Sequence, residues 1–172
     1  MRTLLLESLF RSPFTERAPR PDDAAVAELA AALGRAGRKC LGRSLSIREV
    51  DAGSCNGCEL EIHALNNVFY DVERFGIRFV ASPRHADVLL VTGPVAKNMR
   101  DALKRTYEAM PNPKWVVSVG DCALDGGCFS GSYAVEGGVA GVVPVDLHIP
   151  GCPPRPIEIL ERLLALLERV AT

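Results

Sequence analysis

Four cysteines in this chain have a spacing that suits metal ligands. Cys55 and Cys58 form a Cys-x-x-Cys pair, Cys122 follows a Gly-Asp dipeptide, and Cys152 lies in a Pro-Gly-Cys-Pro-Pro run. Thiolate sulfur binds both zinc and the iron of iron–sulfur clusters. Structural zinc usually takes its cysteines as two tight pairs, whereas this chain offers one pair and two single residues. The spacing therefore favours a 4Fe–4S cluster, with zinc and a set of redox-active or unpaired thiols as the alternatives.

The composition is that of a globular protein and excludes several functional classes. The chain has 172 residues, a net charge of −1, 48% hydrophobic residues and 6% aromatic residues. This balance gives no basis for binding nucleic acid through phosphate contacts or base stacking. No apolar run reaches the ~18 residues of a membrane span, and no secretory signal is evident. We therefore expect a chain without a transmembrane segment, kept in the cytosol, where its six cysteines stay reduced.

Apolar strand-like runs alternate with helical patterns along the chain. Strands are predicted at residues 45–50, 77–80, 87–92, 115–119 and 142–149, and helices at 24–33, 59–73, 97–110 and 157–170. The alternation predicts an α/β fold with a mostly parallel sheet covered on both faces. A Gly-rich stretch over residues 121–141 is expected to be a long functional loop. We expect two parts, an arm and helix at 1–40 that contacts a partner and an α/β domain at 41–172.

The cysteines follow the predicted strands directly. Cys55 and Cys58 come just after the strand that ends at Val50, and Cys122 and Cys152 each follow a later strand. The carboxyl ends of parallel strands lie at one edge of the sheet, where such folds bind ligands. The four cysteines can therefore converge on one point.

Two cysteines remain outside this set. Cys128 lies six residues after Cys122 and could compete with it as a ligand, but we interpret it as a partly buried bystander. Cys40 follows the first predicted helix beside several basic residues, and we interpret it as a solvated loop thiol.

Several motifs resemble one protein family. Residues 53–62 (GSCNGCELEI), 71–77 (DVERFGI), 83–94 (PRHADVLLVTGP), 120–127 (GDCALDGG) and 143–156 (VPVDLHIPGCPPRP) occur in order. Together they resemble the small, proximal-cluster subunits of energy-converting membrane-bound nickel–iron hydrogenases and the related B-type subunit of respiratory complex I. At the first motif, the complex I branch of this resemblance has two adjacent cysteines, whereas the hydrogenase branch has Cys-x-x-Cys. The Cys-x-x-Cys in this chain therefore favours the hydrogenase branch.

The resemblance implies a flavodoxin-like three-layer sandwich that carries one 4Fe–4S cluster at the carboxyl ends of the strands. By motif, the implied ligands are Cys55, Cys58, Cys122 and Cys152. The implied role is electron transfer between a nickel–iron large catalytic subunit and ferredoxin-like iron–sulfur subunits. The complex would include integral membrane subunits, with this chain bound peripherally on the cytoplasmic side of the inner membrane. The alternatives are the equivalent subunit of a quinone-reducing, complex I-type enzyme and a structural zinc or scaffold protein.

Other polar residues near the motifs have weaker assignments. Glu61 matches a family glutamate and is a candidate proton relay, whereas Glu59 is expected to be a helix N-terminal charge. Arg155 is expected to hold the cluster loop, contact a partner or simply be solvated. The three histidines, His63, His85 and His148, are not ligand candidates by spacing, and His148 is expected to be structural.

Overall fold

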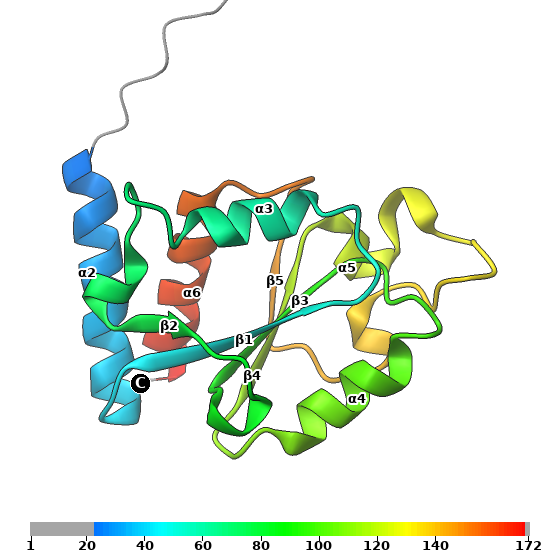
Figure 1. Ribbon diagram of the computed structural model, residues 1–172, viewed down its shortest axis with the longest axis horizontal. Coiled ribbons are helices and arrows are strands. Elements are labelled where there is room, and N and C mark those ends of the chain that lie inside the picture. Colours follow the sequence, from blue (N-terminus) through cyan, green and yellow to red (C-terminus); the bar gives the residue numbers. More distant parts are fainter. Residues whose placement is uncertain (1–22, 171–172) are drawn as a thin grey trace, which may run out of the picture.

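The computed structural model describes residues 23–170, which form a sheet with helices on both sides (Figure 1). The strands are β1 (Leu45–Asp51), β2 (Ile77–Phe79), β3 (Val88–Thr92), β4 (Trp115–Val119) and β5 (Leu147–Ile149). The α-helices are α2 (Asp23–Leu41), α3 (Gly57–Ala64), α4 (Arg100–Ala109), α5 (Asp121–Asp125) and α6 (Pro156–Val170). Short 3-10 turns are η1 (Val72–Phe75), η2 (Pro83–His85), η3 (Gly127–Phe129) and η4 (Val139–Gly141).

All strand pairs in the sheet are parallel, and the strand order is β2-β1-β3-β4-β5. This order is that of flavodoxin-like doubly wound folds. Every residue of β3 and of β4 is buried, as expected for central strands with helices on both faces. The predicted α/β fold with a parallel sheet is confirmed.

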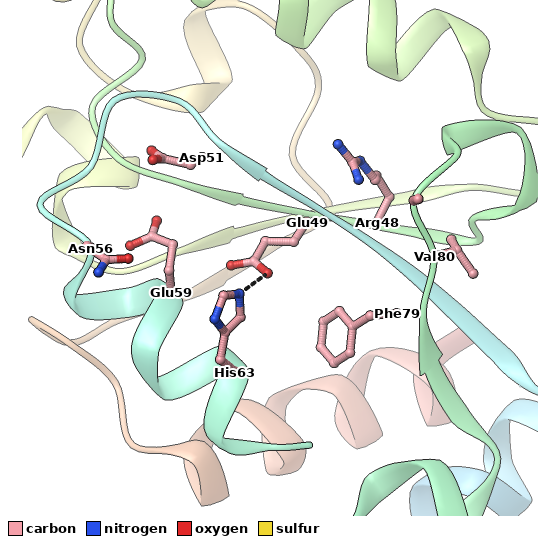
Figure 2. A pocket seen from close by; sticks show the side chains of 9 residues that line it. Arg48, Glu49, Asp51, Asn56, Glu59, His63, Phe79 and Val80 are labelled. Atoms are coloured by element: carbon pink, nitrogen blue, oxygen red, sulfur yellow. Dashed lines mark ion pairs between the residues drawn. The ribbon is translucent and has the colours of Figure 1, made fainter. Parts of the chain in front are cut away.

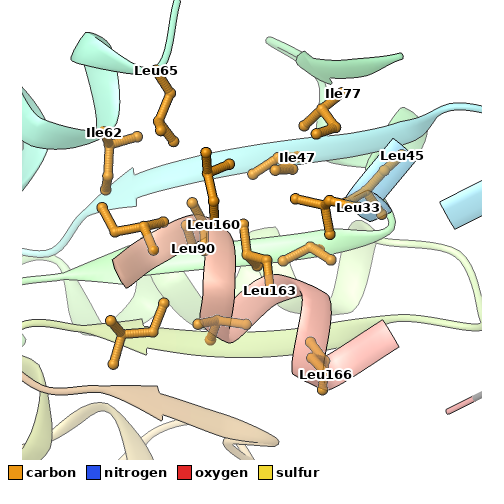
Figure 3. Packing of buried hydrophobic residues seen from close by; sticks show 14 of the residues in the cluster. Leu33, Leu45, Ile47, Ile62, Leu65, Ile77, Leu90, Leu160, Leu163 and Leu166 are labelled. Atoms are coloured by element: carbon orange, nitrogen blue, oxygen red, sulfur yellow. The ribbon is translucent and has the colours of Figure 1, made fainter. Parts of the chain in front are cut away.

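Two cores lie on opposite faces of the sheet. On one face, Leu33 of α2, Ile62 of α3 and Leu160 of α6 pack over β-strand residues such as Ile47 and Leu90 (Figure 3). On the other face, α4 and α5 cover a second core. The sheet is therefore the middle one of three layers, and the loops that carry the cysteines follow its strands at their carboxyl ends.

The first helix is longer than the sequence predicts. The sequence pattern predicts a helix over residues 24–33, but α2 runs on to Leu41. A Cβ at Gly34 would overlap the backbone carbonyl of Phe75, so this glycine serves close packing against η1. The interpretation of Cys40 as a solvated loop thiol is wrong, because Cys40 lies in the last turn of α2 and packs, half-buried, against the core.

The helix that follows the Cys-x-x-Cys pair is shorter than predicted. It was expected to reach residue 73, but α3 ends at Ala64. The side chain of Asn67 accepts hydrogen bonds from the backbone amides of Phe69, at 2.8 Å, and Tyr70, at 3.0 Å. An asparagine that binds backbone amides two and three residues on stabilises a turn in place of a helix.

Two further boundaries differ from the prediction. The last strand, expected over 142–149, is reduced to Leu147–Ile149, because its first residues close the turn η4. The glycine-rich stretch 121–141 is not one loop, since it contains α5, η3 and η4.

The arm over residues 1–20 lies outside the described residues. The helix that was grouped with it, α2, packs against α6. The proposed division at residue 40 stays a prediction. Within residues 23–170, no helix is both long enough and apolar enough to cross a membrane.

Candidate metal centre

All four cysteines of the predicted set line one small cavity at the carboxyl edge of the sheet. Cys55 precedes α3, Cys58 lies in its first turn, Cys122 lies in α5 and Cys152 follows β5. The cavity has a volume of about 80 Å³ and is completed by Ser54, Gly57, Gly93, Asp121, Gly151 and Pro153. Residues almost a hundred positions apart in the chain therefore surround one space.

The loop between β1 and α3 is shaped by the last residue of the strand. One carboxylate oxygen of Asp51 accepts hydrogen bonds from the amides of Gly53, at 2.8 Å, and Ser54, at 2.7 Å. The Ser54 hydroxyl in turn accepts from the Asn56 amide at 3.0 Å. These bonds turn the chain back toward the sheet edge and set the place of Cys55.

A second set of hydrogen bonds joins the loops that carry the other two cysteines. The amide of Gly151 donates to the carboxylate of Asp121 at 2.8 Å, and the amide of Asp121 donates to the carbonyl of Gly151 at 2.9 Å. The loops after β4 and after β5 are thus locked to each other one residue before Cys122 and Cys152.

Close packing brings Cys58 to the end of β4. A Cβ built on Gly120 would lie 2.5 Å from the Cys58 sulfur, closer than real side chains approach. Gly120 also has φ 87° and ψ 156°, a backbone region that essentially only glycine adopts. The absence of a side chain at residue 120 therefore makes room for the Cys58 sulfur.

Burial and neighbouring negative charges raise the pKa of two of these thiols, Cys58 and Cys122. Burial, followed by the negative charges of Glu59 and of the other three cysteines, raises the pKa of Cys58 to about 12. Burial also raises the pKa of Cys122, with Cys128 and Cys152 adding to the effect. Reactive cysteines have lowered pKa values, so the raised pKa values disfavour a redox-active role for Cys58 and Cys122.

The cavity fits a group larger than one ion. Its volume exceeds twice the ~30 Å³ that one water molecule occupies in the liquid. In residues 23–170, no group of three or more His, Cys, Asp or Glu side chains is arranged to hold a metal ion. Four thiols spread around such a space suit the separated corners of an iron–sulfur cluster.

Cys128 lies close to Cys122 but does not line the cavity. It is exposed in η3, so the expectation of a partly buried residue is wrong. After burial, the charge of Cys128 is the largest cause of the raised pKa of Cys122.

Glu61 and Arg155 both lie near Tyr70 and outside the cysteine cavity. The negative charge of half-buried Glu61 adds to the burial that raises the pKa of Tyr70, and Arg155 opposes it. Arg155 is mostly exposed and binds Glu158, with nitrogen–oxygen distances of 3.1 and 2.8 Å. These contacts hold the start of α6.

The histidines lie apart from the cysteines. His63 pairs with Glu49 at 3.4 Å, and His85 is exposed in η2. His148 is on β5, where its Nδ1 lies 2.9 Å from the Ser118 hydroxyl and burial lowers its pKa.

A second, larger cavity of about 440 Å³ lies beside the first (Figure 2). The carboxyl groups of Glu49 and Glu59 point toward the space between β1 and α3. Glu59 does lie in the first turn of its helix, as expected, but it is only 5% exposed, and both its oxygens lack a hydrogen-bond partner. Glu49 was not predicted as a site residue, although an acidic residue on the inward face of a predicted strand was a signal for it.

Fold and site together define an α/β protein with a four-cysteine cavity at the sheet edge where such folds bind cofactors. Residues 55–166 match the family described as "NADH ubiquinone oxidoreductase, 20 Kd subunit". The chain belongs to this family.

Individual relatives come from both hydrogenases and quinone oxidoreductases. The "Probable membrane-bound hydrogenase subunit mbhJ" of Pyrococcus furiosus is 46% identical over 133 residues, 77% of this chain and 80% of its own length. The B-type subunit of the NADH-quinone oxidoreductase of Citrifermentans bemidjiense is 47% identical over 114 residues, 66% of each chain.

A solved structure shows the same fold. One chain of an archaeal membrane-bound sulfane sulfur reductase, a respiratory membrane complex, aligns with a TM-score of 0.67 and 34% identity. The alignment covers 82% of this chain and 76% of the other. The predicted kinship with hydrogenase and complex I subunits is confirmed.

Proposed function

We propose that this chain is an electron-transfer subunit that carries one 4Fe–4S cluster in a membrane-bound, hydrogenase-type complex. The cluster would be held by Cys55, Cys58, Cys122 and Cys152. The observation that carries the proposal is the single cavity that all four cysteines line. Family membership supports the oxidoreductase role, because the relatives are named as subunits of hydrogenase and quinone oxidoreductase complexes.

When bound, a cluster of this kind supplies a site that accepts and releases one electron at a time. The chain's own residues would hold it in place. The bonds between Asp121 and Gly151 fix two ligand loops relative to each other. The raised pKa values of Cys58 and Cys122 mean that loading must release protons from these thiols.

The partners we propose are a hydrogenase-type large catalytic subunit, a ferredoxin-like iron–sulfur subunit and integral membrane subunits. The chain would be attached to the cytoplasmic side of the membrane through them. Exposed apolar side chains flank the cysteine cavity in sequence, with Leu60 on α3 at 60% exposure and Leu124 on α5 at 55%. Such residues are typical of a surface that another protein covers. A proton-relay role for Glu61 is part of this proposal.

The second candidate is the equivalent subunit of a quinone-reducing, complex I-type enzyme. The family description and the 47% identical quinone oxidoreductase relative favour it. The Cys-x-x-Cys pair and the longer match to the hydrogenase relative favour the first candidate.

The test is metal analysis and EPR spectroscopy of the native complex, purified without oxygen. We expect about four irons assignable to this chain, a reduced-state EPR signal, and loss of both in Cys152→Ser. The control is Cys40→Ser, which removes a thiol on α2, far from the cavity in sequence. Nickel in the same preparation would support the hydrogenase-type complex, and iron without nickel would support the quinone-linked candidate. Zinc without iron would refute electron transfer and support a structural role.

A further inference from the structure

The acidic cavity between β1 and α3 contains buried groups that the proposed cluster does not use. Glu59 is at least nine-tenths buried, and neither of its carboxylate oxygens has a hydrogen-bond partner in the described part of the chain. Oε1 of Glu49 is likewise buried without a partner. Figure 2 shows both carboxyl groups directed into the same space. Two residues that line one cavity therefore contain three buried acceptor atoms without donors.

Such an arrangement is unfavourable in the chain by itself. Burying a carboxylate without a donor or a counter-charge costs free energy, and two neighbouring carboxylates add repulsion. Burial raises the pKa of Glu49, and the charges of Glu59 and Asp51 raise it further, against the opposing effect of His63. The arrangement is explained if a cation that is absent from this chain enters the cavity.

The chain's own cations do not fill this role. The Nε2 atom of His63 is 3.4 Å from the other oxygen of Glu49, Oε2, and His63 is 68% exposed. Arg48 lines the cavity but extends to the other side of β1 in Figure 2, away from Glu49 and Glu59. Adjacent residues of a strand point to opposite faces, so Arg48 cannot follow Glu49.

The geometry favours the guanidinium group of an arginine as the cation. Guanidinium is planar, carries five N–H donors and binds carboxylates through paired hydrogen bonds. Its several donors suit a cavity that is lined by two carboxylates, those of Glu49 and Glu59. A cavity of about 440 Å³ has room for such a side chain.

The position of the cavity identifies the source of the arginine. Asn56 lines the acidic cavity, and its neighbours Cys55 and Gly57 line the cysteine cavity. A protein that covers the cysteine edge of the sheet therefore also reaches the acidic cavity. The edge of β1 is open here, because β2 pairs with β1 only from Leu45 to Ile47, while β1 continues to Asp51.

We propose that the acidic cavity receives an arginine side chain from a partner subunit, which binds Glu49 and Glu59 and helps to dock that subunit over the cysteine edge. The proposal rests on the proposed function only in requiring partner subunits. It does not require that the cysteines bind iron.

The test compares the native complex with one that contains Glu49→Gln and Glu59→Gln together. Glutamine keeps the shape of each side chain and removes its charge. We expect the apparent dissociation constant of this subunit, measured by dilution of the anaerobically purified complex, to rise at least tenfold, about 1.4 kcal/mol. The full chain alone should melt at the same temperature as the unmodified chain or higher, because a buried repulsion has been removed.

The matched control is Asp101→Asn with Glu108→Gln. These residues are exposed on α4, which covers the other face of the sheet, and the change in net charge is the same. We expect no change in assembly for this variant. Equal weakening in both variants, or an unchanged dissociation constant in the Glu49 and Glu59 variant, would overturn the proposal.

A cryo-EM structure of the native complex gives a direct second measurement. A partner arginine with guanidinium nitrogens in hydrogen-bond contact with both carboxylates would support the proposal. A metal ion, a lysine or ordered water alone in the cavity would overturn it. Iron content and the EPR signal report on the cysteines separately, so a failure of this proposal is distinguishable from a failure of the cluster assignment.

Discussion

Replacing Gly120 by alanine should disturb the cysteine cavity without removing any candidate ligand. The added Cβ would lie 2.5 Å from the Cys58 sulfur, whereas real Cβ atoms essentially never approach other atoms within 3.0 Å. The sulfur must therefore move by about half an ångström, the difference between these two distances. Functional sites require positions held to within roughly that tolerance.

The backbone adds a second cost. With φ 87° and ψ 156°, residue 120 occupies a region that costs a non-glycine residue on the order of 1–3 kcal/mol. We therefore expect Gly120→Ala to lower the free energy of unfolding by about 2 kcal/mol or more and to reduce the iron content of the purified chain. Anaerobic iron analysis, EPR and chemical denaturation measure these effects.

Gly131→Ala is the matched control. Gly131 has φ 79°, but an added Cβ would meet no atom within 4 Å. This variant should carry a backbone cost alone and retain its iron. Full iron content and an unchanged EPR signal in Gly120→Ala would refute the reasoning, as would equal loss of iron in the control.

Three further predictions concern stability. Leu90→Ala should lower the unfolding free energy by about 2–5 kcal/mol in urea melts, because Leu90 is fully buried under α6, and a loss below about 1 kcal/mol would contradict this packing. Asp87→Ala should lower the unfolding free energy by about 3 kcal/mol in the same assay, since the carboxylate accepts hydrogen bonds from Arg43 and from the buried Ser46 amide. Arg43→Ala leaves the Ser46 bond in place and should lower the unfolding free energy by less. His148 has a lowered pKa in the folded chain, so the unfolded chain binds its proton more readily and stability should fall as the pH drops below about 6.5. His148→Asn should lose less stability than the unmodified chain between about pH 7.5 and pH 5.5. An identical loss of stability in the two proteins would contradict the role of His148 in this pH dependence.

The sheet could be predicted from the sequence because its strands have strong patterns. The runs Val88–Thr92 and Trp115–Val119 are almost entirely apolar, and each is followed by a glycine. Parallel strands place their carboxyl ends at one edge, so the position of each cysteine after a strand predicted that they would meet. The structure places them around one cavity, and their role as ligands stays a prediction.

The remaining features depend on contacts between distant residues. Gly34 reads as a helix breaker in the sequence, but it lies within α2 because η1, some forty residues later, packs against it. Local pattern also could not show that Glu59 is buried. Its first-turn position is that of a solvated helix charge, and only the packing of α3 over β1 encloses it with Glu49.

The short β2 strand has a consequence for aggregation. From residue 48 onward the outer edge of β1 has no strand beside it in the described residues, and an open edge can pair with another chain. Arg48, Glu49 and Asp51 place charges along this edge, and charges there are a common protection against such pairing. Before the complex assembles, Glu49, one of the two carboxylates that we propose for docking, would therefore also help to keep newly made copies of the chain from associating with one another.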